Sequence, residues 1–396
     1  MQDRVSRLES LLGENLFDSV LWGHEYDMSM FNEELKIKIS SGAFRRIVFY
    51  GMGCSSVVSD VMKGFFKSEK IPIKVDVVND YDTEWFIDDS VLQSDGTLSV
   101  IVCYSGWSVE PCLFYDKMMR INKCRNLMVL SGGGKIADLC LRDSVSCVKY
   151  KMRHADREYP LYHVQQFFSI FLDLFNELGI FPKGYDLELE RTVSYLKESF
   201  NPETLSAAKD LADRMRDSTI VFLTTPKWYG TLLKQVTMFF NEIAMVPAHR
   251  NLLHEWSHTE VAAFSNPIHK LSIMTFSDVD DDQYSLEKID ILKGLFGDKS
   301  IVQNRNIEFF DLRLDQNSFM EKYLFANFFA IQVAYHLAIY TDTEGRDLIS
   351  KAAGNPWWNQ KNIEAHPDCR DIPGSLNTED VGFTKTSKEF SKALSI

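Results

Sequence analysis

Short apolar runs that alternate with helical segments constrain the fold of this chain most. β-Branched and aliphatic residues concentrate at 46–51, 73–78, 98–105, 126–131 and 145–150, and segments of helical periodicity separate most of these runs. Strands that are apolar on both faces and joined by helices indicate a parallel sheet covered by helices on both sides. A long amphipathic segment at 162–179 predicts the helix that closes this first unit.

The same alternation restarts after Asn201-Pro202. It predicts strands at 218–225, 270–276 and near 300–310, with helices near 203–216, 229–245, 284–296 and 319–340. Glycines and a proline between 179 and 184 mark the boundary between the two units. We therefore predict an N-terminal helical segment at 1–40, a first α/β domain at 41–184, a second at 185–345 and an extended tail at 346–396.

Composition narrows the class of protein. The 396 residues are 45% hydrophobic and 25% charged, the balance of a packed protein, and the net charge of −13 offers no basic field for nucleic acid or an anionic membrane. We expect a cytoplasmic location, because the N-terminal residues contain no secretory signal and the seven cysteines form no Cys-x-x-Cys pair. The apolar stretch 325–340 is too short to span a membrane, so we expect a buried helix.

Three strand ends carry glycine and serine: GMGCSS at 51–56, CYSGWS at 103–108 and SGGGK at 131–135. Each opens a helix, and unpaired amides at a helix N-terminus favour an anion. Each loop alone could be an ordinary turn with a serine cap, but three at one sheet edge predict a phosphate site. The first loop, with Asp76 downstream, leaves a dinucleotide site open, although such a site does not need the second serine-rich loop.

These three loops resemble those of the sugar isomerase (SIS) domain family, and in particular of the bifunctional phosphoglucose/phosphomannose isomerases. NEIAMVPAH at 241–249 and WSHTE at 256–260 extend the resemblance into the second half. It implies two SIS domains, each a flavodoxin-like parallel sheet between helices, with the substrate phosphate on the first. Departures are Cys103 in place of a serine, Trp107 in place of Asn and Ser108 in place of Thr. The residues implied in substrate binding are Gly53, Ser55, Ser105, Gly106, Trp107, Ser108 and, less directly, Ser131.

The resemblance also implies catalytic residues for an aldose–ketose interconversion. Glu242 matches the base that moves a proton between C1 and C2, and His258 matches the histidine that opens the ring. The alternative for Glu242 is a structural ion pair with a lysine such as Lys234. Two further matches are Lys351, for which an ordinary exposed lysine is the alternative, and Arg157, for which Arg153 is the competing position.

His254-Glu255-Trp256-Ser257-His258 also fits the His-Glu-x-x-His pattern of zinc proteases. A metzincin would continue with glycine at 261 and histidine at 264, where this chain has Val261 and Phe264. Glu255 to His258 instead resemble the Glu-x-x-His stretch of glucosamine-6-phosphate synthase and the fructosamine deglycases. We therefore expect no metal at this motif, and His254 facing solvent or a domain contact.

The resulting hypothesis is a cytoplasmic, homodimeric isomerase of a hexose 6-phosphate that uses neither metal nor nucleotide. A fructosamine-6-phosphate deglycase, or an aminosugar-phosphate isomerase or deaminase, would use the same residues. A non-catalytic regulator that binds sugar phosphates is the alternative from another class. Met245, which stands in place of the family's lysine, and the missing threonine near Glu344 favour that regulator.

Overall fold

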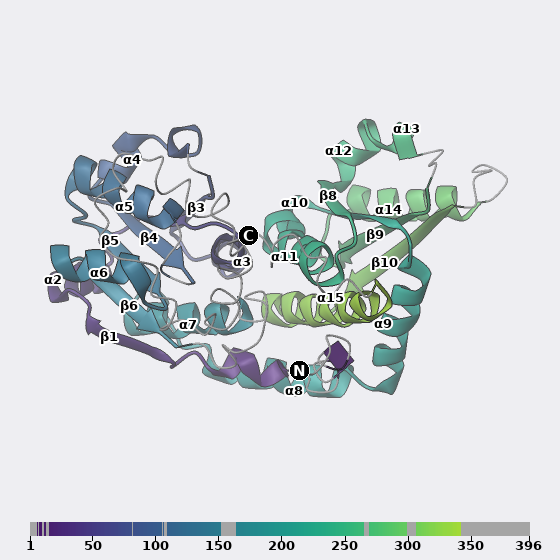
Figure 1. The fold of residues 1–396 in the computed structure, drawn as a ribbon, viewed down its shortest axis with the longest axis horizontal. Coiled ribbons are helices and arrows are strands. Elements are labelled where there is room, and N and C mark those ends of the chain that lie inside the picture. Colours follow the sequence, from purple (N-terminus) through teal and green to yellow (C-terminus); the bar gives the residue numbers. More distant parts are fainter. Residues whose placement is uncertain are drawn as a thin grey trace, which may run out of the picture. The chain divides into compact units, whose positions relative to one another are not determined.

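The chain forms two compact units in the computed structural model. The first unit contains Asp18–Leu187, and the second contains Glu188–Glu344 together with the described residues up to Phe17. Figure 1 draws the first in purple to blue-teal and the second in teal to yellow-green, and each has a sheet with helices beside it. The structure describes Ser6, Leu8, Glu9, Leu12 and residues 16–80, 82–104, 106, 109–151, 164–264, 269–298 and 306–341.

In the described chain, the first unit has a six-stranded sheet in the order β1-β6-β5-β4-β2-β3. Strands β2 to β6 pair in parallel, as predicted, and every residue of β4 and β5 is buried. Strand β1 pairs antiparallel with β6 at the edge. The strands are β1 Tyr26–Met30, β2 Arg46–Tyr50, β3 Lys74–Val78, β4 Thr97–Cys103, β5 Leu127–Ser131 and β6 Ser146–Tyr150.

Strand β1 corrects the prediction that residues 1–40 are a helical segment. Its sequence, YDMSM, alternates half-buried with exposed side chains, because it lies at the edge of the sheet. Only α2 and the short η1 are helical among the fully described elements of that segment. The first-unit helices are η1 Leu16–Leu21, α2 Glu33–Ser40, α3 Cys54–Ser68, η2 Thr83–Trp85, α4 Asp89–Gln93, α5 Val109–Asn122, α6 Gly134–Asp143 and α7 Val164–Glu177.

The second unit has, among its described residues, a four-stranded parallel sheet in the order β10-β9-β7-β8. Its strands are β7 Thr219–Thr224, β8 Ala248–Leu252, β9 Leu271–Asp278 and β10 Ile307–Leu314. The sequence did not reveal β8, because AHRNL is a polar edge strand without an apolar run. The helices are α8 Asp186–Ser199, α9 Pro202–Met215, α10 Pro226–Trp228, η4 Tyr229–Leu233, α11 Lys234–Met238, η5 Phe239–Ala244, α12 Leu253–His258, α13 Val261–Phe264, α14 Gln283–Gly297 and α15 Phe319–Thr341.

The parallel parts of the two sheets follow one topology. β3-β2-β4-β5 in the first unit corresponds to β8-β7-β9-β10 in the second, so the duplicated flavodoxin-like architecture is confirmed. In each sheet the chain builds one strand to one side of its first strand and then crosses to the other side. Ligands of such folds bind beyond the carboxyl ends of the strands at this switch point. The switch points lie between β2 and β4 and between β7 and β9.

Helix α15 is the buried helix predicted for 325–340. Within the described residues it is long and apolar enough to cross a membrane by length and composition, but 72% of its most apolar window is buried inside the protein. It packs against α9 and η5, and both Asn327 and Gln332 are buried with it. A core helix passes the same test, so its hydrophobicity is explained by packing.

Candidate functional site

The first glycine-serine loop follows β2 at the switch point of the first sheet. Gly53 has a left-handed φ of +55°, is exposed, and begins α3 with no side-chain cap. A Cβ at Gly53 would have open space around it. Ser55 is buried, and its Oγ accepts a hydrogen bond from the Tyr104 amide at 3.2 Å. Ser55 therefore connects the first loop to the second, while Gly53 leaves the start of α3 accessible.

The second loop, after β4, is held against the third by backbone contacts. Gly106 has a φ of +73°, and a Cβ on it would lie 1.8 Å from the Gly133 carbonyl oxygen, so no other residue fits there. The Gly106 carbonyl accepts from the Ile136 amide at 3.1 Å. The Gly106 amide donates to Cys103 Sγ at 3.2 Å, so this cysteine helps to hold the loop in place. Ser105, Trp107 and Ser108 lie outside the described residues.

The third loop, after β5, is shaped by Ser131. The side chain of Ser131 is fully buried, and its hydroxyl donates to the Gly133 carbonyl at 2.8 Å. The Gly133 amide in turn donates to Ser131 Oγ at 3.3 Å. These bonds form a turn that brings Gly133 against Gly106. A direct contact of Ser131 with substrate stays a prediction.

Apart from Lys135 at the end of the third loop, side chains around the three loops are largely uncharged. Burial raises the pKa of Tyr104 to about 12, and the neighbouring Cys54 adds to the shift, so the phenol stays neutral at physiological pH. Tyr150 donates its hydroxyl to the carbonyl of Tyr104 at 3.0 Å, and burial raises its pKa well above the usual value. Neutral phenols beside the loops do not repel an anion. The loops offer amides and hydroxyls, which is the chemistry expected of a phosphate site.

Glu242 lies in the second unit on η5, a π-helical turn. A second π-helical turn, η4, precedes α11, and π-helical turns occur frequently at functional sites. Met245, with a left-handed φ of +54°, ends η5. Asn241 joins the turn to β8, because its side chain bonds both the amide and the carbonyl of Ala248, at 2.9 and 3.1 Å. The half-buried Glu242 carboxylate thus sits on a fixed turn, and a structural ion pair with Lys234 stays the alternative.

His258 is the last residue of α12 and is exposed. The helix is anchored by the buried Trp256 and by His254, whose Nε2 lies 2.9 Å from Ser285 Oγ. Ser285 donates to Asp282 at 2.6 Å, so it accepts from Nε2–H of His254. Hydrogen bonds from Ser285 lower the pKa of Asp282 and keep it ionised. His254 is exposed, as expected, and its hydrogen bond fixes α12 to the start of α14.

Glu242 and His258 lie on helices that cover opposite faces of the second sheet. On the side of η5, Phe240 packs against Phe222 with ring centroids 4.8 Å apart, and Ala244 accepts a hydrogen bond from Thr341 of α15. On the side of α12, Trp256 packs in one cluster with residues of β7, β9 and α14. Successive residues of a strand point to opposite faces, so the sheet separates the two helices. Within a single copy of the second unit, Glu242 and His258 therefore lie on opposite sides of the sheet.

The remaining predicted site residues, Arg157, Arg153 and Lys351, lie outside the described residues. The described chain has a group of possible metal ligands elsewhere, at His24, Asp173 and Asp186 of the first unit. It is largely exposed, and Asp173 already pairs with His24 at 2.9 Å and accepts from Tyr26 at 2.8 Å. The histidines of the 254–258 motif are not part of that group.

The chain is similar to known phosphosugar isomerases. Residues 205–347 match the bacterial phospho-glucose isomerase C-terminal SIS domain. The bifunctional phosphoglucose/phosphomannose isomerase of Aquifex aeolicus (strain VF5) is 24% identical over 306 residues, which cover 74% of this chain and 84% of the relative. Residues 205–347 therefore resemble a SIS domain, and the chain as a whole is similar to this isomerase. The relative is similar over both units, whereas the domain match begins in the second unit at residue 205 and ends just beyond it at residue 347.

Solved structures share the fold of this chain. The C-terminal domain of glucosamine-fructose-6-phosphate aminotransferase from Francisella tularensis superposes with a TM-score of 0.55 at 15% identity, over 86% of this chain and 96% of that one. Tagatose-6-phosphate ketose/aldose isomerase from Escherichia coli gives a TM-score of 0.51 at 10% identity, over 78% and 88%. At such identities the likeness concerns the fold.

Proposed function

We propose that this protein is a phosphosugar isomerase that interconverts the aldose and ketose forms of a hexose 6-phosphate. The observation that carries the proposal is the interlocked set of three loops at the switch point of the first sheet. Their backbone is fixed by a glycine-only contact, and they present amides and hydroxyls to an anion, with Lys135 at the end of the third loop. The isomerase relative at 24% identity supports the same class of substrate.

In the proposed mechanism the substrate phosphate binds at the three loops. His258 moves the proton between the anomeric hydroxyl and the ring oxygen, which opens the ring. Glu242 then removes the proton from C2 of the aldose, and O1 gains a proton to give the enediol. The C2 hydroxyl then loses its proton while Glu242 returns its own proton to C1, so the substrate undergoes no net oxidation. A half-buried carboxylate beside buried phenylalanines suits this role, because an apolar environment favours a stronger base.

We further propose that the enzyme is a cytoplasmic homodimer in which a second copy of the chain supplies His258. The sheet of one second unit separates Glu242 from His258, so a single copy of that unit does not combine them. Isologous dimers place the same two elements of both copies against each other, which yields two equal sites.

The test is exchange of the C2 proton of glucose 6-phosphate with heavy water, followed by NMR. Wild-type protein should exchange it, and Glu242→Gln should reduce the rate by a factor of roughly 10²–10⁴ while phosphosugar binding is retained. Glu255→Gln, an exposed acid on α12, is the matched control and should exchange normally. Exchange by Glu242→Gln at the wild-type rate would refute the assigned base.

The dimeric site is tested by mixing two inactive variants, Glu242→Gln and His258→Ala, after unfolding and refolding them together. Half of the dimers are then mixed, and each has one intact site, so roughly a quarter of the wild-type activity should return. No recovery would show that both side chains act within one chain.

The same assay separates the alternative functions. Release of free amine from fructosamine 6-phosphate would assign the protein to the deglycases, whose Glu-x-x-His stretch residues 255–258 of α12 resemble. Binding of hexose phosphates without any proton exchange or amine release would indicate a regulator.

A further inference from the structure

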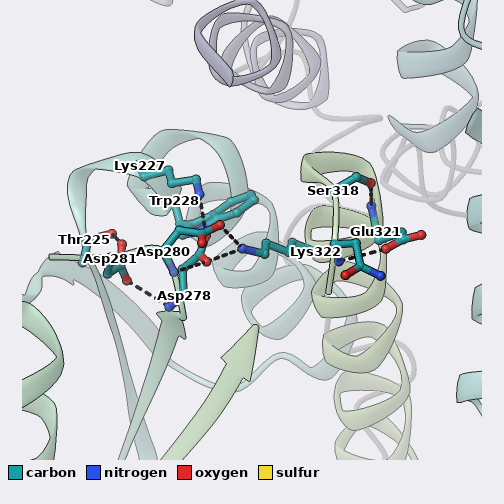
Figure 2. Close-up of polar contacts among 10 residues, drawn as sticks. Thr225, Lys227, Trp228, Asp278, Asp280, Asp281, Ser318, Glu321 and Lys322 are labelled. Atoms are coloured by element: carbon teal, nitrogen blue, oxygen red, sulfur yellow. Dashed lines mark hydrogen bonds and ion pairs between the residues drawn. The ribbon is translucent and has the colours of Figure 1, made fainter. Parts of the chain in front are cut away.

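The switch point of the second sheet contains a buried ionic cluster that the proposed mechanism does not use. Asp278 is the last residue of β9, and Lys227 and Trp228 follow the end of β7 in α10. Lys322 reaches the cluster from the first turn of α15. Figure 2 shows these side chains converging on the Asp278 carboxylate.

Four donors surround the Asp278 carboxylate. Its Oδ2 accepts from the ammonium of Lys227 at 2.5 Å and from the indole N–H of Trp228 at 2.9 Å. Its Oδ1 accepts from the ammonium of Lys322 at 2.5 Å and from the backbone amide of Asp280 at 3.0 Å. Asp278 is 0% exposed. Its carboxylate is therefore enclosed entirely by protein.

The cluster is ionised. Burial would raise the pKa of Asp278, but the hydrogen bonds from Lys227 and Lys322 outweigh it and hold this pKa below its usual value. Burial would lower the pKa of Lys322, which is 3% exposed, and its bonds to Asp278 and to the 70% exposed Asp280 raise it instead. Two ammonium groups, an indole N–H and an amide form a complete binding site for an oxyanion.

We propose that this is an anion site of the second sheet, specific for a carboxylate-sized oxyanion, that the protein fills with its own Asp278. The topological reason is that the cluster lies at the ends of β7 and β9, the switch point at which such sheets bind ligands and the counterpart of the one between β2 and β4. It follows that the second unit takes no external anion at its switch point. The inference stands independently of the proposed isomerase activity.

The experiment is rescue by a free anion. Asp278→Gly in the full chain removes the carboxylate and leaves the buried Lys322 and the more exposed Lys227 without it, so the Tm should fall by roughly 10 °C. Formate at about 100 mM, compared with chloride at equal ionic strength, should recover at least half of that fall, because a bound anion stabilises only the folded state. Wild-type protein should show no difference between formate and chloride.

Asp311→Gly is the matched control. Asp311 lies on β10 of the same sheet and accepts from the hydroxyls of Thr275 and Ser277 at 2.6 and 2.9 Å, with no ammonium group among these contacts. Formate should therefore not raise its Tm above the value in chloride. A formate effect of equal size in both variants, or none in either, would overturn the proposal.

If Asp278→Gly does not fold in chloride, the measurement becomes the yield of native protein after refolding from urea. Recovery in formate and not in chloride would support the anion site. The same failure in both salts, with normal refolding of Asp311→Gly, would mean that Asp278 is an ordinary buried ion-pair partner.

Discussion

Between β2 and β4 the chain places glycine turns and serine hydroxyls, whereas between β7 and β9 it places a buried carboxylate and two lysines. Both crevices arise from the same strand order. Amides and hydroxyls can take up an anion without leaving an uncompensated charge when it departs. Ammonium groups buried at such a place need a permanent counterion. The topology thus creates two equivalent crevices, and the side chains decide which of them an external ligand can enter.

The largest effect is expected at the ionic cluster. Lys322→Met should lower the stability of the second unit by about 3–5 kcal/mol, because Asp278 stays buried with one ammonium fewer. Calorimetry in the presence and absence of a hexose 6-phosphate would measure it, and ligand binding should persist. Lys270→Met, a more exposed lysine in the same unit, is the control and should cost less than about 1 kcal/mol. Equal losses in the two variants would contradict the assignment.

Acidification offers a second readout of Lys322→Met. The folded-state pKa of Asp278 is lowered, so the carboxylate contributes stability that is present above the pKa of an unfolded aspartate and is lost as the pH falls toward the folded value. The substitution weakens this contribution. The stability of Lys322→Met should therefore decline less than that of wild type when the pH is lowered below about 4.

The next largest effect is expected in the phosphate loops. Gly106→Ala would place a Cβ against the Gly133 carbonyl and separate the second loop from the third. Affinity for a hexose 6-phosphate, measured by calorimetric titration, should fall on the order of 100-fold. Gly42→Ala is the control, because φ at Gly42 is +69° but no atom lies within 4 Å of its Cβ position. If both variants bind equally well, the loops are not the site.

The smallest effect concerns one hydrogen bond of the loops. Ser55→Ala removes the acceptor of the Tyr104 amide and should weaken phosphosugar binding about tenfold. Ser59→Ala, one turn further along α3, removes a hydroxyl that bonds only within the helix and should leave affinity unchanged. Titration of both variants checks this, and an unchanged Kd for Ser55→Ala would exclude Ser55 from the site.

The sequence by itself determined the elements with strong local signals. Apolar runs revealed the central strands β2, β4, β5, β7 and β9, because a strand buried on both faces needs consecutive apolar residues. Glycine and serine at strand ends revealed the three loops, because a turn or a helix start also depends on the residues at that position. The edge strands β1 and β8 were missed, because half-exposed strands need no apolar run.

Only the tertiary structure decided which distant residues meet. Asp278 and Lys322 are 44 positions apart, and the sequence signal was no more than a lysine at the start of an otherwise apolar helix. Glu242 and His258 are only 16 residues apart in the sequence, yet β8 lies between them and their helices cover opposite faces of the sheet. Periodicity is a local property of the chain, whereas charge pairing and the face that a helix covers depend on how strands are ordered in the sheet.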